Sequence, residues 1–321
     1  MGIKRILAYA ATYLLWGGAY LAVRVLVQVL PSFFAAGARY CLAALCLSPF
    51  ILLPSSRAPS WRQSCNAVWT GLLLLVAGYG VVFWAEKRLA SWLVAVLLST
   101  TFLWTYLAES LVLRSYRFRA VMLLPLLAGL AGMPLVVGGA WHRVGNSIVS
   151  VLAVLLGALS WSAGSLLVKW IDMPRSTIHT VGLQLASSGI LLLCLSAALG
   201  EWTEARSMAR IFAWRLLLAM TYLVVGASLL GFASFHWLLK HEPASLVATS
   251  CYVNPIVAVI LGVVALHERY SPVQLVGTLA VLGSIVAVWR LQASTGDLEI
   301  MALKRSPKSY AEIPASSACK T

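Results

Sequence analysis

The stretch Leu14–Arg24, LLWGGAYLAVR, returns in altered form 145 positions later as Leu159–Lys169, LSWSAGSLLVK. Each copy places a tryptophan early in an apolar run and a basic residue about two helical turns later. The matching pairs at this offset are Trp16 with Trp161, Leu21 with Leu166, Val23 with Val168, Arg24 with Lys169, and Gly37 with Gly182. This match indicates that the chain contains one unit twice.

A second set of matches follows at an offset of 153 positions. Trp84 falls on Trp237, Lys87 falls on Lys240, and the tripeptide Leu-Val-Ala at 93–95 recurs at 246–248. We assign the change of offset to the loop around 201–210. Each copy has room for five apolar helices, and an odd number of crossings turns the second copy upside down relative to the first.

The composition indicates that most of the chain is surrounded by lipid rather than by water. Hydrophobic residues make up 61% of the 321 residues and charged residues 11%, and the mean hydropathy is +0.88. A soluble domain carries roughly a quarter charged residues, and a membrane span needs about 20 apolar ones. Ten such runs are predicted, at 6–30, 32–54, 67–85, 90–113, 119–140, 146–169, 176–199, 212–235, 244–266 and 271–290.

We therefore predict an all-α polytopic membrane protein with ten transmembrane helices arranged as two inverted five-helix repeats. The repeats are expected at 1–140 and 141–291, and a disordered cytoplasmic tail at 292–321. Lys and Arg are enriched in the loops on the side of both termini, which places both termini in the cytoplasm. The net charge of +14 is thus explained by membrane orientation, and no nucleic acid is expected as a partner. No cysteine spacing indicates a metal site or a disulfide, so no cofactor is expected.

Three further segments carry a family resemblance. They are WGGAYLAVR at 16–24, WAEKRLASWLVAVLLSTTFLW at 84–104, and NPIVAVILGVVALHERYSPVQLVG at 254–277. The chain resembles the ten-span EamA-type members of the drug/metabolite transporter superfamily. The resemblance implies a secondary transporter of the bacterial inner (plasma) membrane; such proteins export amino acids, other small metabolites or cationic drugs, and some import.

The chain departs from the family pattern in three places. It has Phe102 where the family usually has proline, Ser115 where it usually has glutamate, and His267 where it usually has glycine. The first departure leaves open whether span 4 is broken, and so whether the site is symmetric.

Ligand sites of inverted-repeat transporters lie at the repeat interface near the bilayer midplane. Trp16 and Trp161 are predicted to form opposed aromatic walls for an apolar group or a cation, with helix packing or interfacial anchoring as the alternative. Pro255 is expected to bend span 9 and free a backbone carbonyl, although a purely structural kink is also open. The candidate substrate-binding residues are Trp16, Tyr20, Tyr79, Thr101, Trp104, Trp161, Ser165, Tyr252 and Asn254.

Ionisable residues inside a bilayer are costly and are either functional or locally paired. Arg39 is expected to be structural, capping carbonyls of a neighbouring helix, with substrate contact as the alternative. Arg24 and Lys169 are expected to reach the headgroups. Glu268 is expected to form a structural salt bridge beside Arg269.

Two residues are candidates for proton coupling. Burial favours the neutral form of a carboxyl group such as that of Glu109, and the histidine side chain of His236 titrates in a useful range. Pairing of Glu109 with Arg114 or Arg117, and simple packing of His236, are the alternatives.

The sequence thus predicts a secondary transporter that exports a small metabolite, either an amino acid or an amphipathic or cationic compound, by alternating access. An enzyme is not expected, because His241-Glu242 and His267-Glu268 lack the second histidine of a zinc motif. The alternative is a non-transporting membrane scaffold or a lipid-carrier subunit. The expected partners are a small-molecule substrate and the lipid bilayer, and a homodimer stays open.

Overall fold

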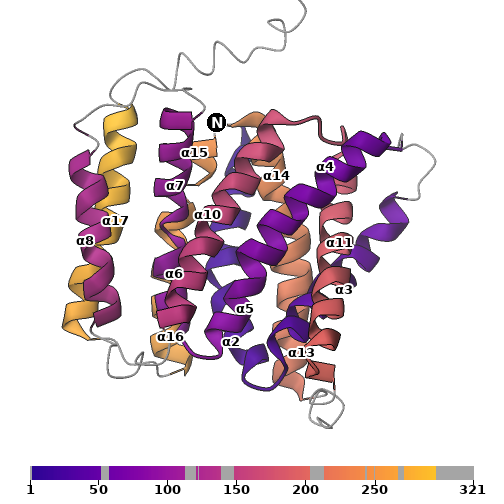
Figure 1. Ribbon diagram of the computed structural model, residues 1–321, viewed down its shortest axis with the longest axis horizontal. Coiled ribbons are helices and arrows are strands. Elements are labelled where there is room, and N and C mark those ends of the chain that lie inside the picture. The colour runs from indigo at the N-terminus through magenta and orange to yellow at the C-terminus, as the bar shows by residue number, and fades with distance from the viewer. Residues whose placement is uncertain are drawn as a thin grey trace, which may run out of the picture.

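The computed structural model describes residues 2–51, 58–112, 121, 123–138, 148–202, 213–242, 244–248, 250–266 and 271–293. These residues form helices and no strand, as the composition predicts. Most of the helices run along one common direction (Figure 1).

Seven helical segments of the described chain are long and apolar enough to cross a membrane. They are Ile3–Val27 (α1, Ile3–Ala10; η1, Ala11–Leu15; α2, Ala19–Val27), Ser32–Ile51 (α3), Trp61–Glu86 (α4, Trp61–Gly71; η2, Leu72–Gly80; α5, Val81–Glu86), Ser91–Ser110 (α6, Ser91–Leu98; α7, Thr101–Leu107; η3, Ala108–Val112), Ile148–Trp170 (α10), Thr177–Ala198 (α11) and Trp214–His241 (α13, Trp214–Thr221; η5, Tyr222–Gly231; α14, Phe232–His241). The η segments are π-helical. We refer to these seven as spans 1, 2, 3, 4, 6, 7 and 8, following the predicted order.

The remaining described helices are α8 (Leu123–Gly138), α15 (Ala244–Val247), α16 (Ser250–Leu266) and α17 (Pro272–Ala293). α8 and α16 contain 16 and 17 residues, short of the roughly 20 that cross the hydrocarbon. α17 has 22 residues but is not one of the seven segments. The predicted spans 5, 9 and 10 stay predictions.

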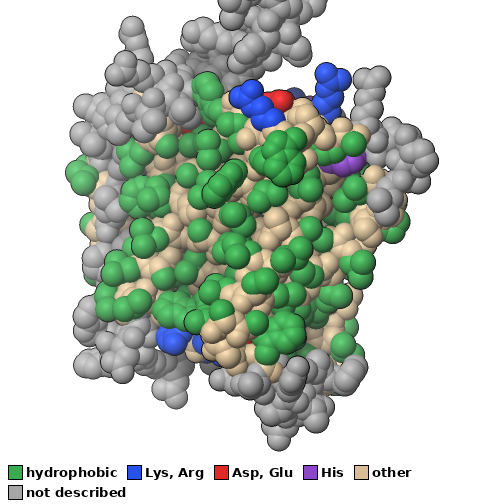
Figure 2. Space-filling model, turned by 45° about the vertical axis from the view of Figure 1, so that its right-hand side comes forward, with side chains coloured by type: hydrophobic (Ala, Val, Ile, Leu, Met, Phe, Trp, Pro, Cys, Tyr) green, Lys and Arg blue, Asp and Glu red, His purple; other side chains and the backbone are tan. Residues whose placement is uncertain are grey.

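The surface is that of a protein surrounded by lipid. Trp69, Leu156 and Trp214 are each about two-thirds exposed in the middle or at the end of a span. Figure 2 shows hydrophobic side chains over the middle of one face, with Lys and Arg at its upper and lower edges. Such a surface would be unfavourable in water.

Two predicted helix ends are wrong, and local hydrogen bonds explain both. Span 3 begins at Trp61 rather than at 67 because Ser60 and Gln63 form a capping box, in which each side chain bonds the other residue's backbone N–H. Span 8 continues to His241 rather than ending at 235. Its last turn is stabilised by Lys240, which donates hydrogen bonds to the Arg175 carbonyl and to the Thr177 hydroxyl.

Span 4 is interrupted between α6 and α7 although it has no proline there. At the interruption, the Ser99 hydroxyl donates to the Val96 carbonyl over 2.6 Å, and the Thr100 hydroxyl donates to the Leu97 carbonyl over 2.7 Å. Side-chain hydroxyls thus satisfy carbonyls at the interruption, so Phe102 does not keep this span regular.

Helices of the two predicted repeats pack against each other in matched pairs. α3 lies along α11, and α8 lies along α17. α10 packs on η2, while η1 packs on η5. Spans 1, 3, 6 and 8 therefore meet in the middle of the protein, where the candidate site lies.

Candidate functional site

An aromatic cluster occupies this central meeting point. We use that name for Trp16, Tyr20, Tyr79, Trp161, Phe232 and Phe235. The ring centroid of Trp161 lies 5.5 Å from each of those of Trp16, Tyr79 and Phe235. Tyr20 joins through Tyr79, at 6.5 Å. The structure therefore brings four predicted site residues into one chain of contacts, and Phe232 and Phe235 are members that the sequence reasoning missed.

Each central tryptophan rests against a glycine of the other half of the chain. A Cβ atom added to Gly231 would lie 2.7 Å from the Trp16 indole nitrogen, and one added to Gly78 would lie 3.3 Å from Cε3 of Trp161. The two glycines are themselves 153 positions apart. The Trp16 indole nitrogen also donates to the Ala227 carbonyl over 3.1 Å, so its ring is fixed against η5.

Two small cavities flank the tryptophans. The first has a volume of about 10 Å³ and the second of about 20 Å³, which is space for roughly one water molecule each. The first is lined by Trp16, Arg39, Tyr40, Leu75, Tyr79, Trp161, Leu185, Ala227, Ser228 and Phe232. The second is lined by Trp16, Thr101, Thr105, Trp161, Ser165, Phe235, Leu239, Ala244, Ala248 and Ser250. Trp16 and Trp161 line both, so they separate the two spaces.

Arg39 is buried at the first cavity, with 4% of its surface exposed. Its Nε donates to the Ser228 hydroxyl over 2.9 Å, and its guanidinium carbon lies 5.1 Å from the Tyr40 ring centroid and 5.9 Å from that of Tyr79. We expected carbonyl capping, but the described contacts are with a hydroxyl and aromatic faces. Its Nη1 has no hydrogen-bond partner among the described residues.

The second cavity receives two of the predicted polar residues. Thr101 and Ser165 line it, and the Ser165 hydroxyl donates to the Trp161 carbonyl. Thr105, which donates to Ser162 over 2.9 Å and so links span 4 to span 6, was missed by the sequence reasoning. Trp104 packs against the apolar core around span 4 and lines neither cavity.

The candidates in span 9 are described in part. Asn254 is buried, and with its amide oriented to satisfy both groups it donates to the carbonyls of Ser250 and Tyr13. It thus ties α16 to η1. Tyr252 and Pro255 lie in α16, but their side chains are outside the described part, and so is Glu268.

Arg24 and Lys169 make equivalent contacts in the two halves. The Arg24 guanidinium donates to the carbonyls of Glu86 and, over 3.1 Å, Leu89. The Lys169 ammonium donates to the carbonyls of Leu239, over 3.0 Å, and Glu242. Both pairs of acceptors are 153 positions apart. The expected headgroup anchors therefore serve as caps for the last carbonyls of spans 3 and 8.

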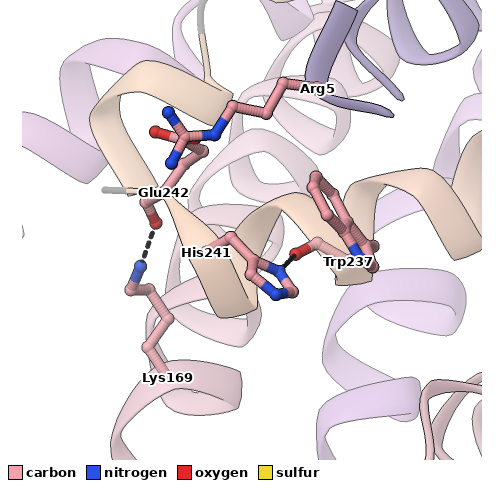
Figure 3. A network of polar contacts seen from close by, with 5 residues as sticks. All are labelled: Arg5, Lys169, Trp237, His241 and Glu242. Carbon is pink, nitrogen blue, oxygen red and sulfur yellow. Dashed lines mark hydrogen bonds and ion pairs between the residues drawn. The ribbon is translucent and has the colours of Figure 1, made fainter. Parts of the chain in front are cut away.

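The end of span 8 is also joined to span 1. Arg5 forms an ion pair with Glu242 over 2.7 Å, beside the Lys169 contact (Figure 3). His241 stacks on Trp237 in the same turn. Leu239, Ala244 and Ala248 line the second cavity, so these polar contacts lie next to one of its walls.

The two coupling candidates lie apart from these polar contacts. His236 is fully buried, both of its ring nitrogens lack hydrogen-bond partners among the described residues, and its ring meets the rings of Phe232 and Phe235 edge to face. Glu109 is buried in η3. Arg114 and Arg117, its predicted partners, lie outside the described residues.

Known proteins resemble this chain in sequence, and one solved structure resembles it in fold. YedA of Escherichia coli strain K12, named as an uncharacterized inner membrane transporter, is 29% identical over 282 residues that cover 88% of this chain and 89% of YedA. The transporter YoaV of Bacillus subtilis strain 168 is 21% identical over 286 residues, covering 87% and 94% of the two chains. A solved crystal structure superposes with a TM-score of 0.61 over 90% of this chain and 98% of its own, at 18% identity. This last likeness shows the fold alone.

The relatives are transporters by name, YedA of the inner membrane, and the apolar helices and lipid-facing surface of this chain (Figure 2) agree with an integral membrane protein. The sequence profile of the EamA-like transporter family matches residues 3–138 and 148–290. Since these two segments contain every helix of the aromatic cluster and nearly all of the described chain, the protein belongs to the EamA-like transporter family.

Proposed function

We propose that the protein is a secondary transporter that exports a small metabolite, an amino acid or an amphipathic or cationic compound, by alternating access. The observation that carries this proposal is the reciprocal contact at the centre, where a tryptophan of each half packs against a glycine of the other half. Trp16 of the first half rests on Gly231 of the second, and Trp161 of the second half rests near Gly78 of the first. If one half rocked against the other, the tryptophans would separate from these glycines, and one of the two cavities would open to one side of the membrane.

Two observations support the inverted repeats on which such rocking depends. Arg24 and Lys169 cap the ends of the corresponding spans in their own halves. The two segments that match the family profile divide the chain close to the predicted boundary between 140 and 141. We propose further that both termini lie in the cytoplasm and that the membrane is a bacterial inner membrane.

The small size of the cavities favours a second candidate, a non-transporting scaffold or lipid-carrier subunit. Cavities of about 10 and 20 Å³ are too small for a metabolite. Transport requires a second state in which the tryptophans separate. A scaffold has no need of one.

Flux measurements decide between the two candidates. Purified protein is reconstituted into liposomes, and uptake of labelled amino acids, nucleosides and quaternary amines is compared with protein-free liposomes, with and without a pH gradient. Saturable uptake of at least one class is expected. Uptake equal to that of empty liposomes for every class favours the scaffold.

Orientation is tested separately by thiol labelling. Lys87 and Lys240 are exposed and 153 positions apart. In a variant without its native cysteines, Lys87→Cys and Lys240→Cys are expected to react with a membrane-impermeant maleimide from opposite faces. Labelling of both from one face contradicts the inverted arrangement.

A further inference from the structure

We propose that Arg39 and Tyr40 bind the carboxylate group of the transported solute, whose apolar part lies against the aromatic cluster. This inference rests on the proposed transport function and narrows its substrate class to carboxylates with an apolar or aromatic body.

The first argument is the charge of Arg39. No described carboxylate forms an ion pair with it, and its contacts are one hydroxyl and three aromatic rings, those of Tyr40, Tyr79 and Phe83. Contacts of a cation with aromatic faces are weaker than the penalty for removing that cation from water. Glu86, the buried carboxylate one turn after Phe83, forms no ion pair with it either, so a buried arginine without a described ion-pair partner favours an anion bound from outside the protein.

The second argument is a pair of hydrogen-bond donors. Arg39 Nη1 and the Tyr40 hydroxyl are both buried, both lack a hydrogen-bond partner among the described residues, and both belong to side chains that line the first cavity. Buried polar atoms are normally satisfied, so each exception calls for an explanation. A carboxylate has two oxygens and accepts readily from a guanidinium and a hydroxyl.

The third argument is the composition of the lining. Arg39 is the one charged residue among those that line the first cavity. A cationic solute would be repelled there, and a dianionic phosphate would bring a second charge that no lining residue neutralises. One carboxylate balances one guanidinium. Trp16, Tyr79 and Trp161 on the same cavity offer aromatic faces to an apolar body.

The small volume of the first cavity sets a condition for binding. A cavity of about 10 Å³ admits the solute only when the tryptophans that line both cavities move apart. Carboxylate binding is therefore expected to favour the open arrangement, because only that arrangement accommodates both the charge and the ring.

Three ligands with one ring system provide the test. Binding of indole-3-acetate, indole-3-acetamide and tryptamine to the purified protein in detergent is measured by competition against radiolabelled indole-3-acetate. The three carry a carboxylate, a neutral amide and an ammonium group on the same indole. Indole-3-acetate is expected to bind at least about tenfold more tightly than the amide, and tryptamine more weakly still.

Two arginine variants locate the selectivity. Arg39→Gln is expected to remove the preference for the carboxylate, and Arg39→Lys to retain part of it. Arg215→Gln is the matched control, because Arg215 also lies near an aromatic ring, that of Trp214, but is exposed and away from the cavities.

The inference is overturned by three results: no binding of indole-3-acetate, equal binding of the acetamide or tryptamine, or a carboxylate preference that survives in Arg39→Gln. If Arg39→Gln does not fold, the three-ligand comparison on the native protein decides alone. Selective binding without uptake in liposomes contradicts the transport proposal and leaves the carboxylate site standing, so the two failures are distinguishable.

Discussion

The indole ring of Trp16 meets that of Trp161 almost at a right angle, with an interplanar angle of 88° and centroids 5.5 Å apart. Edge-to-face packing is a favoured geometry for aromatic pairs. The two residues are also mates in the sequence repeat, 145 positions apart. A contact between repeat mates lies on or near the axis that relates them, which is where an alternating-access site is expected.

We predict that Trp16→Ala and Trp161→Ala each reduce flux by about tenfold or more while protein abundance in the membrane stays unchanged. Each substitution removes at least two ring contacts, and one such contact contributes about 0.5–1.5 kcal/mol beyond its buried area. Initial uptake rates in liposomes, normalised to protein, provide the measurement.

Trp69→Ala is the control for these variants, because Trp69 is 66% exposed on the outer surface of span 3. Its flux is expected to match the native protein. Native flux in both central variants would remove the two tryptophans from the transport path.

Gly231→Ala is expected to lower both thermal stability and flux. Its new Cβ would meet the Trp16 indole at 2.7 and 2.9 Å, so the ring must leave its hydrogen bond to Ala227. Overpacking of this kind costs about 1–3 kcal/mol. Gly78→Ala is expected to have a smaller effect, because its closest approach is 3.0 Å.

Gly283→Ala serves as the comparison, since its Cβ would meet nothing within 4 Å. Alanine is the better helix former by about 1 kcal/mol, so this variant should be as stable as the native protein or more so. Thermal unfolding in detergent measures all three. Equal unfolding temperatures for Gly231→Ala and Gly283→Ala would show that Trp16 is not fixed by Gly231.

The sequence repeat predicted the pairing of Trp16 with Trp161, and it also contained a signal for Gly78 and Gly231, which share the second offset. It could not predict what Arg24 and Lys169 bind, because the choice between headgroups and carbonyls depends on where spans 3 and 8 end in space. The sequence also could not predict which groups surround the Arg39 guanidinium. The repeat mate of Arg39 is Gln184, so the positive charge occurs in one of the two repeats only, but the lack of a described ion-pair partner depends on how distant helices pack.

Span 4 illustrates a further limit. The replacement of the usual proline by Phe102 left the interruption of this span open. Ser99 and Thr100 produce it through hydrogen bonds to the carbonyls three residues earlier, and serine and threonine in a helix bond in this way only in some rotamers. The residue types alone therefore did not show whether the helix of span 4 is interrupted.

Arg24→Ala and Lys169→Ala are expected to lower stability by similar amounts, because the two cations bind equivalent pairs of carbonyls. A hydrogen bond from a charged donor contributes about 1.5–3 kcal/mol. Lys87→Ala, at an exposed position beside the same helix end, is the control and should unfold at the native temperature. An effect confined to one of the two variants would contradict the equivalence.

His236→Leu is expected to keep or raise stability, because it replaces a buried ring that has no described hydrogen-bond partner and packs against Phe232 and Phe235. An unsatisfied buried polar group costs about 1–3 kcal/mol. Thr105→Val is the matched control: Thr105 is also buried, but its hydroxyl donates to Ser162 over 2.9 Å, so this polar-to-apolar substitution should destabilise. Thermal unfolding compares the two variants, and a larger loss of stability for His236→Leu would reveal a partner of the imidazole.

His236→Leu also tests proton coupling. If a pH gradient no longer stimulates uptake by this variant, the coupling role belongs to His236. If the stimulation is retained, Glu109 stays the candidate.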